Sequence, residues 1–395
     1  MLKATKVLLP ILIALVVLGA IGAWDRLSTG KLNLNFGSYI PWGIWVGLYI
    51  YLVGLSGGAF LIVFLHHALG IRALRRASLY ALLVALTTLG AGLVLVLADL
   101  GHMDRFWRLY TFANPNSILA WMVWIYTVYA LVLLAMLYAL AKEKQGWLKP
   151  LSVVGFILVI TFGGGEGALF GVLGSKAAWS SGVQPIRFLF SAFLSGAGIV
   201  AFTTVAFRRW QADQEHHGQV EFLRYLVLGF LALNLLVEFA EFTVTSYSST
   251  PAIVEAYDLM LFGSYWWLFW LGQIGIGLVL PILLLVPPCD GKPANLGTAG
   301  LFIAIGLAGT KQNFVYLGLA VPDFRALPEA FVHARLSVVY FPSLTEWLVA
   351  IGVVAAAALV FLIAIEKLPF VDGRHAPPVG PANARLEPLR EGGGA

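Results

Sequence analysis

Long apolar stretches constrain the fold of this chain more than any other feature of its sequence. A helix that crosses the hydrocarbon core of a membrane needs about 20 apolar residues, and inside lipid every backbone N–H and C=O group must find a partner within the protein. We place helices at roughly 7–24, 41–65, 77–100, 118–141, 150–172, 186–207, 221–242, 262–286, 296–319 and 344–367. The sequence therefore predicts an all-α integral membrane protein of about ten transmembrane helices and excludes a soluble enzyme.

The composition agrees with a membrane protein, because 60% of the residues are hydrophobic and only 11% are charged. Soluble proteins carry about 25% charged residues. The first apolar stretch follows Lys3 and Lys6 but precedes no A-x-A cleavage site, so we expect an uncleaved helix. The single cysteine, Cys289, excludes an internal disulfide and an iron–sulfur cluster held by this chain, since such a cluster needs about four thiolates.

Lysine and arginine residues are concentrated in one of the two sets of loops, by roughly two to one. Cytoplasmic loops carry the excess of positive charge, so the bias predicts that both ends of the chain lie in the cytoplasm. We therefore expect a multi-pass protein of the inner (cytoplasmic) membrane. The tail 368–395 is rich in Pro, Gly and Arg and is predicted to be disordered.

A short motif occurs twice and suggests an internal repeat. Leu55–Ala59 resembles Leu194–Gly198, and the same spacing separates Asp99 from Glu238. Four helices lie between the copies, so both copies would share one orientation, as in a parallel repeat. The repeat predicts two four-helix bundles, 41–172 and 173–320, with the first helix and its loop (1–40) and the last loop and helix (321–367) outside them.

Among the ionisable residues within or at the ends of the predicted helices, we single out five as candidates for chemistry, namely Asp99, Glu166, Glu238, Glu241 and Lys311. Charged side chains inside a membrane are costly and mark function by default, and Glu238 and Glu241 share a helix face. We expect Glu166, Glu238, Glu241 and Lys311 to form a proton pathway. Two non-functional interpretations remain open. In the first, Asp99 and Glu241 lie near the membrane surface and are simply hydrated. In the second, Glu166 forms a structural hydrogen bond with a neighbouring helix, since the glycines beside it let helices approach closely.

Haem and metal sites are not expected in this chain. A membrane haem needs axial ligands deep in the bundle, and Cys and His metal sites need clustered ligands. The histidines all fall at helix ends, in loops or in the tail: His66, His67, His102, His216, His217, His333 and His375. Any redox chemistry would therefore use a diffusible carrier or a cofactor of a partner protein.

The segment from Asp99 to Arg108 combines carboxylates, an imidazole, arginines and aromatic rings where the third helix reaches the membrane surface. A quinone head group needs this mixture, because its carbonyls accept hydrogen bonds and its redox reaction moves two protons. The alternative is an aromatic belt with arginines at the level of the lipid head groups. That alternative accounts for Trp107 and Arg108 better than for Asp99 and His102.

Several motifs together resemble the NrfD-like family, whose type member is the membrane subunit of polysulfide reductase. They are Tyr51–Phe60, Asp99–Gly101, Arg105–Arg108, Asn114–Pro115 with Ser117, and Trp179 followed by Pro185–Gly196. The resemblance covers most of the second to sixth helices. It implies a subunit without a cofactor of its own that binds menaquinone or ubiquinone near the outer face. It also implies electron exchange with a ferredoxin-like iron–sulfur subunit, itself connected to a molybdopterin enzyme or a multihaem cytochrome.

Carried over by motif, the resemblance makes Asp99 the acid of the quinone site. Tyr49, His102 and Arg105 would lie beside the head group, and Arg105 and Arg108 would help to dock the iron–sulfur partner. Some ten-helix members have a histidine in the fifth helix, where this chain has Glu166 and no histidine. Glu166 would then take over that position or the proton route through this helix would be missing.

Two other functions remain open at this stage. A secondary transporter also has internal repeats and buried carboxylates, and Gly163–Gly167 could break a helix at mid-membrane. A purely structural membrane anchor of the complex would keep the fold without binding a quinone. Copurification with an iron–sulfur protein distinguishes the main hypothesis from the transporter, and quinone extraction distinguishes it from the anchor.

Overall fold

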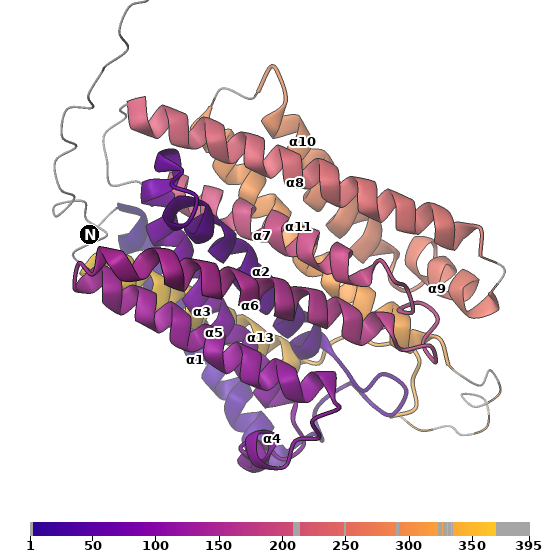
Figure 1. Cartoon of the computed structure of the whole chain (residues 1–395). Coiled ribbons are helices and arrows are strands. Elements are labelled where there is room, and N and C mark those ends of the chain that lie inside the picture. Colours follow the sequence, from indigo (N-terminus) through magenta and orange to yellow (C-terminus); the bar gives the residue numbers. More distant parts are fainter. Residues whose placement is uncertain are drawn as a thin grey trace, which may run out of the picture.

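Ten long apolar helices make up the computed structural model (Figure 1), which describes residues 3–207, 214–248, 250–289, 292–322, 326, 330, 333 and 335–368. They are α1 (Lys3–Thr29), α2 (Ile44–His67), α3 (Arg75–Asp99), α5 (Ile118–Ala141), α6 (Gln145–Gly171), α7 (Gln184–Ala206), α8 (Gln214–Ser246), η3 (Leu268–Val279) with its continuation α10 (Leu280–Leu285), α11 (Pro293–Ala320) and α13 (Leu344–Lys367). Each is long and apolar enough to cross a membrane. The prediction of an all-α protein with ten transmembrane helices is therefore confirmed.

Short helices between the spans were not predicted. They are η1 (Arg72–Leu74), η2 (Met103–Arg105), α4 (Arg108–Thr111) and α9 (Pro251–Leu261). The eighth span begins at Leu268 and not at 262, because α9 and the turn after it occupy the preceding residues. This span also opens as a π-helix, a form that the sequence pattern did not indicate.

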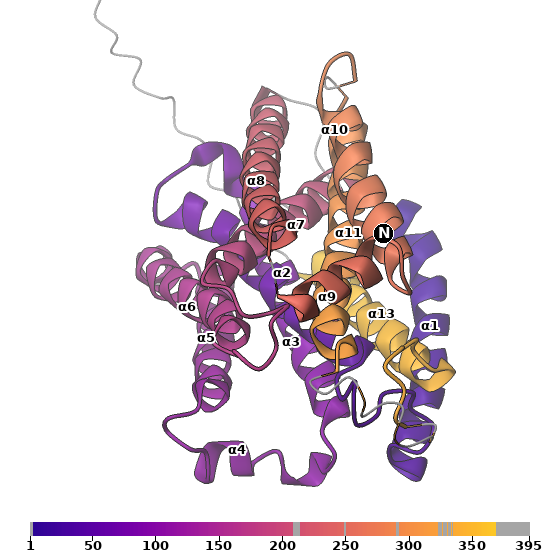
Figure 2. The ribbon, with the colours of Figure 1, turned by 90° about the vertical axis from the view of Figure 1, so that its right-hand side faces the viewer.

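Consecutive spans alternate in direction, so the bundle has two ends. The end of the bundle where α3 finishes is called the Asp99 end. The opposite end, where α2 finishes, is called the His67 end. The helices α6, α8 and α11 finish at the Asp99 end, and α2, α5, α7 and α13 begin there. The short helices α4 and α9 lie at the Asp99 end as well (Figure 2).

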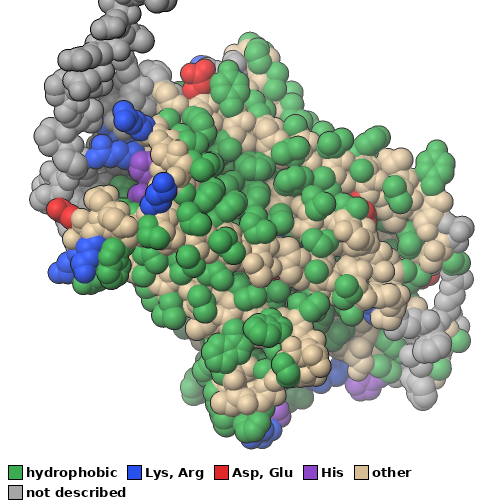
Figure 3. Space-filling model, viewed as in Figure 1, with side chains coloured by type: hydrophobic (Ala, Val, Ile, Leu, Met, Phe, Trp, Pro, Cys, Tyr) green, Lys and Arg blue, Asp and Glu red, His purple; other side chains and the backbone are tan. Residues whose placement is uncertain are grey.

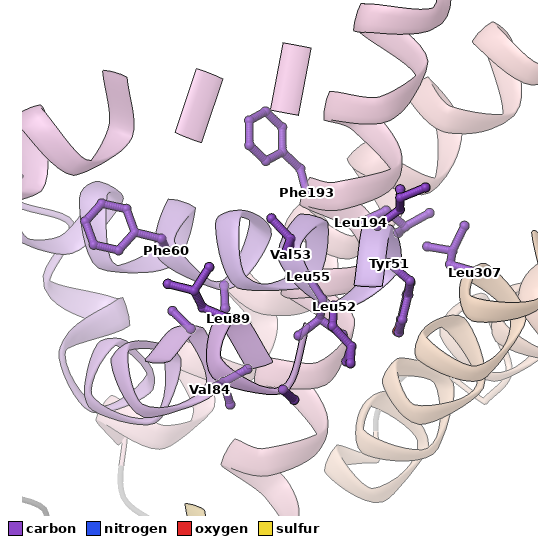
Figure 4. Packing of buried hydrophobic residues seen from close by; sticks show 14 of the residues in the cluster. Tyr51, Leu52, Val53, Leu55, Phe60, Val84, Leu89, Phe193, Leu194 and Leu307 are labelled. Carbon is purple, nitrogen blue, oxygen red and sulfur yellow. The ribbon is translucent and has the colours of Figure 1, made fainter. Parts of the chain in front are cut away.

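The helices α2 and α7 form the centre of the molecule, whereas α1 is largely exposed. Figure 4 shows Phe193 and Leu194 of α7 in the same buried hydrophobic cluster as Val53 and Leu55 of α2. Figure 3 shows a side surface that is mostly hydrophobic, with Lys and Arg side chains gathered toward the ends. This distribution is the one expected of a helix bundle surrounded by lipid.

The two copies of the repeated motif pack directly against each other where α2 crosses α7. A Cβ atom on Gly58 would lie 1.8 Å from the carbonyl oxygen of Ala192, and one on Gly196 would lie 2.0 Å from the carbonyl carbon of Gly58. Only glycine lets the two backbones approach this closely. The repeat motif therefore builds the central helix crossing.

The peripheral helices α1 and α13 pack along each other, and α13 also contacts α3 (Figures 1 and 2). Between them, Gly19 and Gly352 meet closely, since a Cβ on Gly19 would lie 2.3 Å from the Cα of Gly352. In the centre, α6 contacts α2, α5 and α7, and α11 contacts α7, η3 and α2.

The division into bundles 41–172 and 173–320 stays a prediction. The tail 368–395, predicted to be disordered, lies outside the described residues apart from Leu368.

Candidate functional site

A chain of hydrogen bonds connects three helices in the interior near the Asp99 end. The hydroxyl of Tyr126 on α5 donates to Oε1 of Glu166 on α6 over 2.6 Å. The hydroxyl of Tyr49 on α2 lies 3.1 Å from that of Tyr126, and the two rings meet edge to face. Glu166 is only 4% exposed. A buried carboxylate requires such donors, so the predicted residues Tyr49 and Glu166 are joined through Tyr126, which the sequence analysis did not single out.

Lys311 approaches these hydrogen-bonded groups from α11. Its Nζ lies 3.3 Å from the centroid of the Phe188 ring, a close cation–π contact. Lys311 and Glu166 line one small cavity together with Ser191 and Ser195. The cavity has a volume of about 10 Å³, which is close to the space that one water molecule needs. The structure therefore brings Glu166 and Lys311 to the same small cavity, and their part in a proton pathway stays a prediction.

The carboxylates Glu238 and Glu241 of α8 have partners in the first turn of α7 and on the segment before it. Arg187 donates from Nε to Oε1 of Glu238 over 2.8 Å and from Nη2 to Oε2 over 2.7 Å. This is a bidentate ion pair, the strongest arrangement for these two groups. Ser181 donates to Oε2 of Glu241 over 3.1 Å. Burial raises the pKa of the nearby Tyr257 on α9, so its hydroxyl stays neutral.

Asp99 is the last residue of α3. Arg26 of α1 hydrogen-bonds to the backbone at this helix end. Arg26 donates from Nε to the carbonyl oxygen of Ala98 over 3.1 Å and from Nη2 to that of Leu100 over 2.7 Å. Because helix ends leave carbonyl groups without intrahelical partners, these two bonds stabilise the end of α3. Among the described residues, no group hydrogen-bonds to the buried Oδ1 of Asp99.

The predicted residues that follow Asp99 lie at the surface. Asp104 stands between His102, whose Nδ1 lies 3.9 Å from Oδ1, and Arg105, whose Nε lies 3.7 Å from Oδ2. The side chains of His102 and Arg105 are 69% and 53% exposed. Arg108 stacks on its neighbour Trp107. The structure thus places His102, Arg105 and Arg108 at the surface, whereas Tyr49 is partly buried and hydrogen-bonded to Tyr126.

A second buried carboxylate, Glu346 on α13, was missed by the sequence analysis. It is fully buried, accepts the backbone N–H of Asn35 over 2.6 Å and accepts the hydroxyl of Tyr340. Its backbone N–H also donates to Ser343, the residue that caps α13. Ser343 and Glu346 have the spacing of a capping box, a signal that was present in the sequence. Arg187 and Arg26 were missed because both lie near helix ends, where arginine is usual.

Within the ranges that the structure describes, no group of three or more His, Cys, Asp or Glu side chains is arranged to hold a metal ion. The polar groups near the Asp99 end include hydroxyls, carboxylates, an imidazole, a lysine and arginines. These groups donate, accept and transfer protons.

Sequence comparison decides the family. Residues 33–323 match the family described as "Polysulphide reductase, NrfD". The chain belongs to the NrfD family. The resemblance inferred from the motifs at Tyr51–Phe60 and Asp99–Arg108 is thereby confirmed, and the chain is a multi-pass membrane protein of this family.

Curated relatives of this NrfD-family protein match it over most of its length. A selenate reductase subunit of Mesobacillus selenatarsenatis is 32% identical, with 92% of this chain and 94% of the relative covered. The Hdr-like menaquinol oxidoreductase integral membrane subunit of Archaeoglobus fulgidus is 24% identical, with the same coverage of 92% and 94%. A polysulfide reductase subunit of Wolinella succinogenes is 28% identical, with 72% and 95% covered. These relatives are, by name, subunits of oxidoreductases.

Proposed function

We propose that this chain is the membrane subunit of a respiratory oxidoreductase complex and that it binds a quinone or quinol beside Asp99. The names of the relatives support the first part, since they include subunits of selenate reductase, polysulfide reductase and a menaquinol oxidoreductase. The observation that carries the second part is the buried Oδ1 of Asp99, to which no described group donates a hydrogen bond. Burying an acceptor of this kind costs folding free energy unless a ligand or a water molecule donates a hydrogen bond to it.

The chemistry of Asp99 suits a quinol. Oxidation of a quinol releases two electrons and two protons, and a carboxylate within hydrogen-bond reach of the hydroxyl accepts a proton directly. Arg26 fixes the helix end that carries Asp99, and the positive charges of Arg26 and Lys31 act on the carboxylate. His102 and Arg105, exposed on the loop after α3, would contact the head group from the membrane surface.

The interior groups would then move protons. Tyr49 and Tyr126 connect to Glu166 by hydrogen bonds, and Glu166 shares its cavity with Lys311. We propose that Glu166 and Lys311 exchange the proton and that Glu241 is the next carboxylate along this route. In this proposal Glu238, which the sequence analysis placed in the pathway, neutralises Arg187 and does not itself carry the proton.

The electrons would pass to a partner protein that holds the metal cofactors. We propose a ferredoxin-like iron–sulfur subunit, connected to a molybdopterin or multihaem cytochrome subunit. Arg105 and Arg108 are exposed at the Asp99 end and would attract acidic groups of that partner. With the chain oriented by its Lys and Arg bias, this end faces the outside of the inner membrane and both termini face the cytoplasm.

The test is quinol-dependent electron transfer by the purified complex with Asp99→Asn, which keeps the shape of the side chain but removes the base. We expect the rate to fall about 100-fold, the typical contribution of a general base. Asp104→Asn is the matched control, because this carboxylate lies five residues further on and is 74% exposed. An unchanged rate in Asp99→Asn removes Asp99 from the mechanism.

Two other measurements test the class of function. A transporter would move a solute without any partner, and a structural anchor would yield a complex from which no quinone can be extracted. The proposal predicts copurification with an iron–sulfur protein and an extractable quinone.

A further inference from the structure

Two cations on neighbouring helices, Arg187 of α7 and Lys311 of α11, are arranged reciprocally. The Nζ of Lys311 lies 3.3 Å from the centroid of the Phe188 ring, and the guanidinium carbon of Arg187 lies 5.6 Å from the centroid of the Phe314 ring. The two phenylalanine rings meet edge to face at 5.3 Å. Each helix thus supplies one cation and one ring, and each cation lies over the ring of the other helix. This arrangement fixes both cations relative to each other.

The two cations differ in their acidic partners. Arg187 is bound to Glu238 by two hydrogen bonds of 2.8 and 2.7 Å. Lys311, by contrast, forms no ion pair within 4.0 Å with any carboxylate of the residues that the structure describes, and it shares a cavity with Glu166. An arginine in a protein stays charged, whereas a buried lysine can lose its proton. Arg187 is therefore a fixed positive charge neutralised by Glu238, and Lys311 is the one of the two cations that can exchange a proton.

The charges that act on Lys311 come from three helices, from Arg187 on α7, Glu166 on α6 and Glu238 on α8. Two carboxylates thus compete for one ammonium group. Whichever of them is not already paired with another cation attracts it more strongly. We propose that Arg187 is a positioning residue, which occupies Glu238 and so leaves Glu166 as the carboxylate with which Lys311 exchanges its proton.

The internal repeat supports this assignment. Arg187 precedes Ser195 by the same number of residues as Leu48 precedes Ser56, and Glu238 corresponds to Asp99. In the first copy, therefore, no arginine on α2 faces the carboxylate at the end of α3, and the Oδ1 of Asp99 has no hydrogen-bond partner among the described residues. In the second copy, Arg187 occupies both oxygens of the equivalent carboxylate, Glu238. The arginine thus distinguishes a carboxylate with an unpartnered oxygen from one held as a counter-charge.

This inference rests on the proposed function, and its test uses the intact complex in lipid vesicles that contain a pH-sensitive dye. Two quantities are measured side by side, the rate of quinol-dependent electron transfer and the number of protons moved per electron. In Arg187→Leu, Glu238 loses its partner and Lys311 turns to it. We expect the number of protons per electron to fall about tenfold, within the range seen when a coupling residue is changed, while electron transfer changes little.

The double variant Arg187→Leu/Glu238→Leu removes the competing carboxylate together with its partner. Replacing a buried ion pair by apolar side chains is usually tolerated, and we expect proton movement within about twofold of the native value. Arg187→Lys keeps a cation beside Glu238 and should likewise preserve proton movement. Recovery of proton movement in these two variants would show that Arg187 acts by occupying Glu238. If Arg187 had only a structural role, neither variant would recover proton movement selectively.

Each outcome decides the matter. Unchanged proton movement in Arg187→Leu overturns the inference, and so does a double variant that moves as few protons as Arg187→Leu. Should Arg187→Leu fail to assemble, the double variant decides alone, because the inference requires it to move protons normally. Failure of the proposed proton route looks different, since Glu166→Gln and Lys311→Met would then both leave proton movement unchanged.

Discussion

Gly196→Ala at the crossing of α2 and α7 is a sharp test of how this fold is held together. The added Cβ would lie 2.0 Å from the carbonyl carbon of Gly58 and 2.1 Å from the backbone nitrogen of Ala59, whereas ordinary contacts begin at 3.4 Å. The atoms in the way belong to a backbone, which cannot rotate aside. The two helices would therefore have to separate by about 1.4 Å at this point.

The cost follows from that displacement. Overpacking a tight core by one methyl group costs about 1–3 kcal/mol, and we expect the upper end because both contacts are with main-chain atoms. A loss of about 3 kcal/mol lowers the folding equilibrium more than 100-fold. The change would also move α7, which carries Phe188, relative to α2, which carries Tyr49.

The assay is unfolding of the purified protein in detergent micelles by increasing sodium dodecyl sulfate, followed by circular dichroism. The matched control is Gly90→Ala in α3, where an added Cβ meets nothing within 4 Å. That control should keep or slightly raise stability, by about 0.4–1 kcal/mol, since alanine loses less conformational entropy than glycine on folding. Equal unfolding midpoints for Gly196→Ala and Gly90→Ala would refute the reasoning.

Two further changes test buried hydrogen bonds. Tyr126→Phe removes the donor to Glu166 and should destabilise the protein by about 1–3 kcal/mol while slowing proton movement; the control is Tyr138→Phe, whose side chain on the same helix is exposed. Glu346→Leu leaves the backbone N–H of Asn35 without its acceptor and should cost about 2–3 kcal/mol in the same unfolding assay. Glu346→Gln keeps an acceptor oxygen and should cost less, and the reverse order of these two variants would contradict the role given to Glu346.

The fold could be predicted largely from the sequence because lipid leaves few choices. Each apolar stretch must form a helix, so ten stretches gave ten spans. The loops were harder, because α9 and α4 are short and depend on contacts with the helix ends that they cover. Thus the eighth span was placed six residues too early, at 262 and not at Leu268.

The candidate site could be predicted in its residue types but not in its pairings. Glu166 and Lys311 stood out as charges inside spans, and the structure places them in one cavity. Tyr126 did not stand out, because tyrosine is common in membrane helices and only the packing of α5 against α6 shows which carboxylate it meets. Arg187 did not stand out, because a sequence does not reveal that α8 brings Glu238 to within hydrogen-bond distance of it.

The depth of Glu166 has a consequence for the response of this protein to voltage. Glu166 lies five residues before the end of α6 at Gly171, which is about 8 Å along a helix and about a quarter of a hydrocarbon core that is about 30 Å thick. Moving one charge across the whole core works against about 2.3 kcal/mol per 100 mV, so a proton that reaches Glu166 from the nearer surface works against only about 0.6 kcal/mol. A transmembrane potential would therefore hardly slow the protonation of Glu166 from the nearer surface.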